Sequence, residues 1–129
     1  MFSHVTIGTN DMEKARRFYD GVAAAVGLAP LMVVDGGTGY GRKDGRAQLW
    51  IVRPLDKQSA SAGNGITIGL EAPDRESVDA AFAAAMAGGG TDEGKPGIRA
   101  HYHPNYYGAY VRDPDGNKLC AMHRMPKAA

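Results

Sequence analysis

The chain has 129 residues, a usual size for a single domain that buries a hydrophobic core. Its 15 basic and 14 acidic residues leave a formal net charge of +1, so we expect no nucleic acid or anionic membrane as a partner. No apolar run is long enough to span a bilayer, and the N-terminus lacks a basic segment followed by an apolar signal core. The single cysteine, Cys120, excludes an intrachain disulfide and fits a reducing compartment, which predicts a cytoplasmic protein.

The first half of the chain predicts a strand, a helix and three further strands. Residues 5–8 form the first strand, and a helix follows in which apolar side chains recur at helical spacing. Asn10 is expected to cap this helix, with Glu13 completing a capping box, and Gly27 is expected to end it. The three strands that follow are predicted over 31–35, 38–42 and 47–52.

The second half repeats this order. A strand over 66–72 leads to a helix that begins after Asp74 and ends at three consecutive glycines. The stretch 91–104 is broken by glycine and proline, and we expect a loop there with at most one short strand. Two strands follow, over 106–112 and 117–123, joined by the tight turn Asp113-Pro114-Asp115-Gly116.

Two strand–helix–strands units in so short a chain predict two modules that bury their apolar faces against each other. Residues 54–64 are polar and rich in serine, alanine and glycine, and are the expected linker. We therefore expect a single domain over 1–129, with module one at about 1–53 and module two at about 65–125.

The chain resembles the vicinal oxygen chelate superfamily in three features. These are the order of its elements, the segment HVTIGTNDMEKARRFYD near the N-terminus and the segment YYGAYVRDPDGNKLCAMH near the C-terminus. This group includes glyoxalase I, bleomycin-resistance proteins and extradiol dioxygenases, and the resemblance covers nearly the whole chain. It implies an α+β fold of paired βαβββ modules, with curled, cup-shaped mixed sheets and the helices outside, usually in a homodimer. In the family's enzymes it also implies a divalent metal that binds vicinal oxygens and stabilises an enolate or activates dioxygen.

The resemblance places four metal-ligand positions in this chain, and only His4 matches. The position late in the first module falls at or near Gln48, and the one after the Asp-Pro-Asp-Gly-Asn turn falls on Cys120. Aligning the two helices puts Thr67 opposite His4, whereas aligning VTIG with ITIG puts Gly65 there. Neutral oxygens are weak ligands for zinc, nickel or iron. We therefore expect no cofactor; a divalent metal held by His4 and a Cys120 thiolate is the alternative.

Without a metal, we expect His4, Gln48, Thr67 and Cys120 to converge in one pocket that holds water or a small organic ligand. His4 is equally interpreted as an ordinary strand histidine, and Cys120 as a small buried hydrophobic residue. Trp50 is expected either in the core or as a stacking wall of the pocket.

The segment from His101 to Tyr107 is the densest polar and aromatic stretch of the chain. His101 and His103 would share a face if the backbone were extended, as an acid–base or metal-binding pair does. The alternative is a loop with solvent-exposed histidines beside a proline turn. In either case we expect this segment at the pocket rim, because loops on rigid sheets carry function.

Three functions remain open from the sequence, of which the third is a housekeeping fold whose site has degenerated to a scaffold. The first is a glyoxalase-like enzyme, a lyase, isomerase or dioxygenase acting on a small oxygenated metabolite, with an altered or lost metal site. The second is a non-catalytic protein of the bleomycin-resistance type that sequesters a small molecule. The missing ligands favour binding, whereas the histidine and tyrosine segment favours chemistry without a metal.

Overall fold

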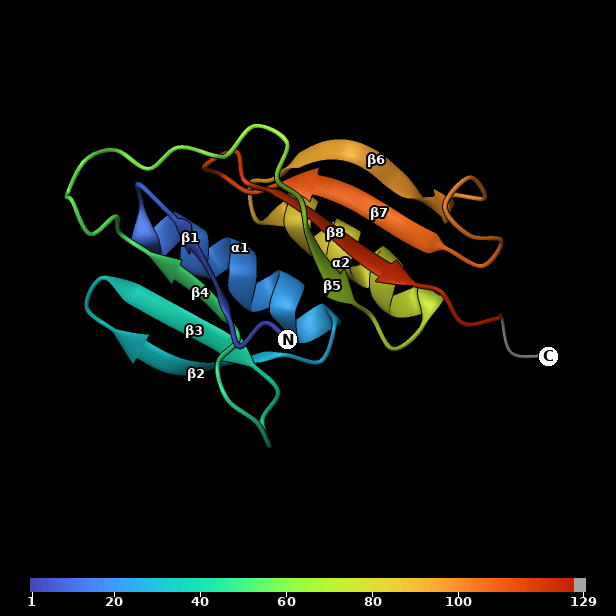
Figure 1. Cartoon of the computed structure of the whole chain (residues 1–129), viewed down its shortest axis with the longest axis horizontal. Helices are drawn as coiled ribbons and strands as arrows, with labels where there is room; N and C mark the ends of the chain where they lie inside the picture. Colours follow the sequence, from blue (N-terminus) through green and yellow to red (C-terminus); the bar gives the residue numbers. More distant parts are fainter. Residues whose placement is uncertain (127–129) are drawn as a thin grey trace.

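The structure, a computed structural model, describes residues 1–126 and contains two modules with the same order of elements (Figure 1). The last three positions of the expected single domain lie outside the described residues. In module one the elements are β1 (Val5–Gly8), α1 (Met12–Ala25), β2 (Ala29–Val34), β3 (Gly37–Gly41) and β4 (Leu49–Val52). In module two they are β5 (Ile68–Glu71), α2 (Arg75–Ala87), β6 (Thr91–Ile98), β7 (Tyr107–Arg112) and β8 (Lys118–His123).

Each module forms one four-stranded mixed sheet, with the strand orders β1-β4-β3-β2 and β5-β8-β7-β6. The first strand of each module pairs in parallel with its last strand, and the remaining pairs are antiparallel. Helix α1 contacts β2, β3 and β4, and α2 contacts β6, β7 and β8, so each helix covers one face of its own sheet (Figure 1). This confirms the predicted α+β fold of paired βαβββ modules with mixed sheets.

Successive strand residues point to opposite faces of a sheet. The residues on the face that the helix covers form the core between the sheet and the helix. In β4, Leu49 and Ile51 are buried in the core, whereas Trp50 and Val52 are half-buried on the open face that no helix covers. The largest fully buried side chains of this core come from both modules: Phe18, Tyr19, Tyr40, Ile51 and Leu119.

The two helices also pack against each other, a contact that the repeated pattern does not predict. Small residues permit this approach, since a Cβ at Gly21 would lie only 3.4 Å from the Cβ of Ala84. Ala85 of α2 consequently belongs to the same core cluster as the side chains of α1. One core cluster therefore spans both modules, and a second cluster lies mainly in module two.

Two local predictions were wrong. The N-cap of α1 is Asp11, which accepts a hydrogen bond from the Lys14 amide at 3.2 Å, and not Asn10. The Asn10 side chain instead holds the linker, donating to the carbonyl of Ala60 at 3.1 Å and accepting from its amide at 2.7 Å. A side chain used by another segment is not free to cap the helix.

The second difference concerns β6, which is an eight-residue strand where a loop was expected. It is one of the two edge strands of its sheet, so only one side of its backbone needs partners, and an edge position tolerates Pro96. Its pairing with β7 shifts register between Asp92 and Gly94 and again between Gly94 and Gly97. The glycines that suggested a loop lie at these irregularities of the strand pairing.

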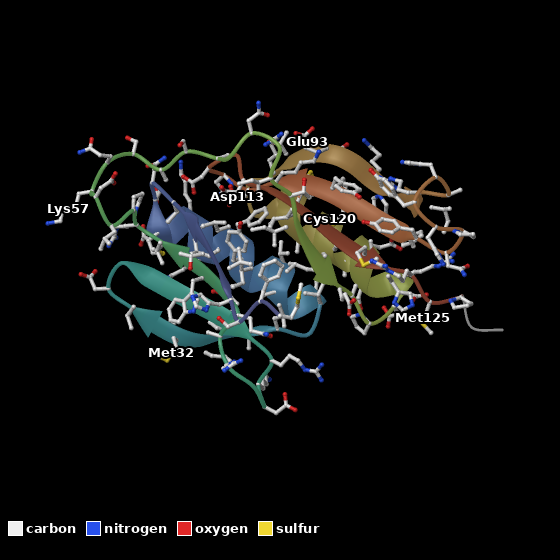
Figure 2. All side chains as sticks on the ribbon, in the orientation of Figure 1. Met32, Lys57, Glu93, Asp113, Cys120 and Met125 are labelled. Atoms are coloured by element: carbon white, nitrogen blue, oxygen red, sulfur yellow. The ribbon has the colours of Figure 1, made fainter. Side chains whose placement is uncertain are left out.

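The turn at 113–117, here called the latch turn, is built around the buried carboxylate of Asp113. Its Oδ1 accepts the amides of Asp115 and Asn117, both at 2.9 Å, and its Oδ2 accepts the Asn117 Nδ2 at 2.9 Å. The hydroxyl of Tyr19, on α1 of the other module, also donates to Oδ2, at 2.5 Å. Figure 2 shows Asp113 at the junction of the two modules.

Further hydrogen bonds fasten the latch turn to the start of module one. The carboxylate of Asp115 accepts from the Thr9 hydroxyl at 2.5 Å and from the Asn10 amide at 2.8 Å. The Asn117 side chain donates to the carbonyl of Gly8 at 3.1 Å. The turn that the sequence predicts is therefore the main polar connection between the modules.

Candidate functional site

Strands β1 and β5 are edge strands of the two sheets and are not hydrogen-bonded to each other. They border a seam between the modules, and the latch turn closes one end of it, at Gly8. At the other end lies a cavity of about 610 Å³, here called the seam cavity, lined by residues 2–4, by Val5 at the start of β1 and by all of β5. Its volume falls within the range of about 300–1,000 Å³ that is typical of small-molecule sites.

The seam cavity has polar side chains from both modules and a largely apolar wall. Module one supplies Ser3, His4, Tyr40, Arg42 and Gln48, and module two supplies Glu71. The apolar part of the lining consists of Phe2, Val5, Val26, Leu28, Leu49, Ile68, Leu70, Ala72 and Pro73. An apolar cavity with a few convergent polar groups is the usual form of a ligand site.

The two modules can be compared residue by residue because the helix caps Asp11 and Asp74 lie 63 positions apart. The same shift places Ile68 opposite Val5, and each pairs with a leucine of the last strand, Leu119 and Leu49 respectively. The shift is therefore the true structural correspondence in the first strand and helix of each module.

This correspondence explains why the cavity exists. In module one the latch turn is held by the Thr9 hydroxyl, the Asn10 amide and the Tyr19 hydroxyl. The corresponding residues of module two are Ala72, Pro73 and Phe82, none of which carries that donor. These three residues therefore cannot hold a second latch turn at this end of the seam. The seam cavity lies there instead.

His4 and Gln48 meet at the cavity because their strands are paired there. The amide of Val5 donates to the carbonyl of Gln48, and the amide of Gln48 donates to the carbonyl of Tyr40, both at 2.8 Å. Ser3 Oγ lies 2.6 Å from His4 Nδ1, which leaves Nε2 with no hydrogen-bond partner among residues 1–126. His4 therefore presents Nε2 for proton transfer or hydrogen bonding.

The strand register corrects one assignment from the resemblance. Leu49 corresponds to Leu119, so the residue opposite Cys120 in module one is Trp50 and not Gln48. Trp50 lies on the open face of the first sheet over Gly39, where an added Cβ would come within 2.9 Å of the indole ring. It forms a half-buried wall of that face and does not line the seam cavity.

Thr67 and Cys120 belong to the second sheet, and neither lines the seam cavity. Thr67 is exposed just before β5, whereas Cys120 is a buried residue of β8 (Figure 2). Within one chain, His4 and Gln48 therefore line the seam cavity, whereas Thr67 and Cys120 lie outside it. The strands that carry them lie in two separate sheets, and only His4 and Gln48 are neighbours.

Cys120 lies instead beside two tyrosines on the open face of the second sheet. Its sulfur is 3.7 Å from the Tyr106 hydroxyl, which is 2.9 Å from that of Tyr110. Burial raises the pKa of the Cys120 thiol, and burial also raises the pKa of Tyr106. All three groups are therefore neutral at physiological pH, and the cysteine is not an activated nucleophile.

His101 and His103 lie in the loop between β6 and β7, not on an extended strand. The amides of Tyr102 and His103 both donate to the carbonyl of Arg99, which coils the backbone at this point. The His101 ring packs on Tyr102 with 4.2 Å between centroids, and His103 Nδ1 accepts from the Asn105 amide at 3.0 Å. Both histidines are exposed, and neither lines the seam cavity.

The residues at the family's metal positions do not fit a metal. By the structural correspondence these positions hold His4, Trp50, Thr67 and Cys120, which offer one imidazole and one thiol that burial keeps protonated. Within residues 1–126 no three histidine, cysteine or acidic side chains are grouped so as to hold an ion. No reaction step is therefore assigned to a metal here.

Arg42 and Glu71 were not predicted from the sequence, although both line the seam cavity. Arg42 begins the turn between β3 and β4, and the residue types of this segment indicate only a turn. Glu71 was hidden because it lies in an apolar strand segment. The signal that points to this place is the 63-position shift, which aligns Ala72 and Pro73 with the latch-binding residues Thr9 and Asn10.

The fold and the position of the cavity define a paired βαβββ protein, and comparison with known proteins gives its family. Residues 1–121 match the glyoxalase/bleomycin resistance protein/dioxygenase superfamily, so the chain belongs to that family. A search of curated proteins found no match.

Solved structures agree with this assignment. A glyoxalase/bleomycin resistance protein from Albidiferax ferrireducens is 42% identical, with a TM-score of 0.88 over 96% of this chain and 99% of that one. A glyoxalase/bleomycin resistance protein/dioxygenase family enzyme from Burkholderia phytofirmans shares the fold at 22% identity, with a TM-score of 0.72 over 96% and 98% of the chains. A glyoxalase I mutant from Zea mays shares it at 23% identity and a TM-score of 0.66, over 94% of this chain and 45% of that one.

Proposed function

We propose that this protein binds a small oxygenated metabolite in the seam cavity. The observation that carries the proposal is a cavity of about 610 Å³ with an apolar wall and polar side chains contributed by both modules. The missing second latch supports it as well, because the space is left open by specific residue types at the start of α2 and not by loose packing.

We further propose that the protein is an enzyme that works without the family's metal, of the lyase or isomerase type. His4 supports this reading, since it is the one imidazole among the lining residues, and its Nε2 is unpartnered within the described residues. A histidine placed against a bound carbonyl compound moves a proton to or from carbon or oxygen, which is the step that isomerases and lyases share. Dioxygenase chemistry receives no support from the residues that line the cavity.

The second candidate is a non-catalytic protein that sequesters a small molecule, as the bleomycin-resistance branch implies. It is favoured by the loss of three of the four ligand residues, because a cavity without reactive groups still binds. His4→Gln separates the two functions. The enzyme reading predicts that turnover is lost while ligand affinity changes little, with His101→Gln and His103→Gln as matched controls that keep turnover.

The experiment for the binding proposal uses a cavity-filling substitution. Gln48→Trp adds an indole at an exposed lining position, and Gln58→Trp makes the same change in the linker, outside the cavity. Calorimetric titration with methylglyoxal–thiol hemithioacetals and with catechols should show affinity that falls at least about tenfold in Gln48→Trp only. Equal affinity in both variants would mean that the ligand binds elsewhere.

We also propose a homodimer in the cytoplasm. Each sheet leaves one face without a helix, and β2 exposes Met32, Val33 and Val34 in a row, so a second copy has apolar surface to cover. The single cysteine supports a reducing compartment. Within residues 1–126, no helix has the length and apolarity to cross a membrane. Sedimentation of only a 13.6 kDa species at micromolar concentration would contradict the dimer.

A further inference from the structure

Two oppositely charged side chains line the seam cavity, one from each module. Arg42 follows β3, and Glu71 is the last residue of β5. Arg42 Nε lies 3.7 Å from the carboxylate of Asp44, but both side chains are more than 70% exposed, and such a pair holds its partners weakly in water. Glu71 forms no ion pair with any residue of 1–126. Both charges are therefore available to a ligand.

The module-two wall of the cavity selects against a negative group. At the other end of the seam, the corresponding wall binds the Asp115 carboxylate of the latch turn through the Thr9 hydroxyl and the Asn10 amide. Ala72 and Pro73 provide neither donor, and Glu71 replaces Gly8 at the position whose carbonyl accepts from the latch. A cationic or hydrogen-bond-donating group is thus favoured beside Glu71, where an anion would meet a like charge.

The module-one wall selects for a negative group. The guanidinium of Arg42 offers parallel N–H donors whose spacing matches a carboxylate. His4 and Gln48 lie on the same module and add neutral hydrogen-bonding groups. Apolar side chains of both modules, including Leu49 and Leu70, line the same cavity and suit an uncharged ligand body.

We propose that the seam cavity selects small zwitterionic molecules of the amino-acid type, with a carboxylate at Arg42, an ammonium group at Glu71 and an apolar side chain against the remaining wall. This inference rests on the proposed function, since it names the ligand class of the same cavity. It goes further in assigning opposite charge preferences to the two modules.

The test uses three probes that share a phenyl group and a two-carbon chain and differ in the charged groups they carry: L-phenylalanine has an ammonium and a carboxylate, 3-phenylpropionate only the carboxylate, and phenethylamine only the ammonium. Their affinities are measured by amide chemical-shift titration, which also shows whether the shifts occur at the cavity. Phenylalanine should bind at least about fivefold more tightly than either singly charged probe. Glu71→Gln should weaken phenylalanine and phenethylamine and leave 3-phenylpropionate unchanged, and Arg42→Gln should weaken phenylalanine and 3-phenylpropionate only.

Glu76→Gln and Arg46→Gln are the matched controls, because both side chains are exposed and neither lines the cavity. Equal affinity for all three probes, or equal losses in the control variants, would overturn the inference and leave the proposed function standing. So would cavity binding of hemithioacetals or catechols without binding of any of the three probes. Failure of every compound to shift cavity amides would overturn both proposals together.

Discussion

Removing the Tyr19 hydroxyl should weaken the attachment between the modules. In Tyr19→Phe the buried carboxylate of Asp113 loses a 2.5 Å hydrogen bond that joins α1 to the latch turn. The two residues are 1% and 3% exposed, so water does not replace the lost donor. A hydrogen bond to a buried charged group contributes about 2 kcal/mol to the free energy of unfolding, because its acceptor is left under-satisfied when the donor is removed. For a domain of this size, that loss lowers the melting temperature by roughly 8 °C.

The matched control is Tyr107→Phe, which removes a hydrogen bond of similar length, 2.6 Å, to the carboxylate of Asp79. Asp79 is exposed, so water takes over the hydrogen bond, and we expect a loss of about 0.5 kcal/mol or less. Urea unfolding followed by circular dichroism measures both variants. Equal losses for Tyr19→Phe and Tyr107→Phe would refute the conclusion that the latch turn is a main connection between the modules.

Three further predictions concern single groups. Hydrogen bonding from Ser77 holds the pKa of the Asp74 carboxyl below its ordinary value. The ionised cap therefore stabilises the fold fully at pH values above the ordinary pKa, and this stabilisation is lost as the pH falls through the lowered pKa. Asp74→Asn keeps a capping oxygen but does not titrate, so urea unfolding at pH 6 and pH 2.5 should show a smaller acid-induced loss than in the wild type. Cys120 should react with iodoacetamide at pH 7 far more slowly in the native protein than in urea, since burial raises its pKa and removes thiolate; equal rates by mass spectrometry would contradict this. Purified protein should hold no stoichiometric zinc, nickel or iron by elemental analysis, and about one such ion per chain, lost in His4→Ala, would restore the metalloenzyme hypothesis.

The sequence predicts most of the fold because its signals are local. The strand and helix order follows from apolar periodicity, and the Asp113–Gly116 turn follows from its residue types. The exceptions depend on distant partners: Asn10 does not cap α1 because Ala60 uses its side chain. Strand β6 forms because it pairs with β7, and this pairing accommodates two shifts of register.

The site is less predictable, because it depends on which strands lie side by side. His4 and Gln48 were placed correctly together, but the counterpart of Cys120 becomes clear only from the pairing of Leu49 and Leu119 with their first strands. The seam cavity itself results from groups that are missing, at Ala72 and Pro73, and a missing donor leaves no motif in a sequence. The missing donors become apparent only when the two halves of the chain are aligned position by position.

The central claim is that the open end of the seam is the ligand site. Its most direct test is amide chemical-shift mapping during titration with methylglyoxal–thiol hemithioacetals, catechols and L-phenylalanine. The account predicts that at least one compound shifts a contiguous set of amides at His4, Gln48 and 68–72, and that Gln48→Trp abolishes these shifts while Gln58→Trp preserves them. Shifts that gather instead around Tyr106 and Cys120, on the open face of the second sheet, would contradict it.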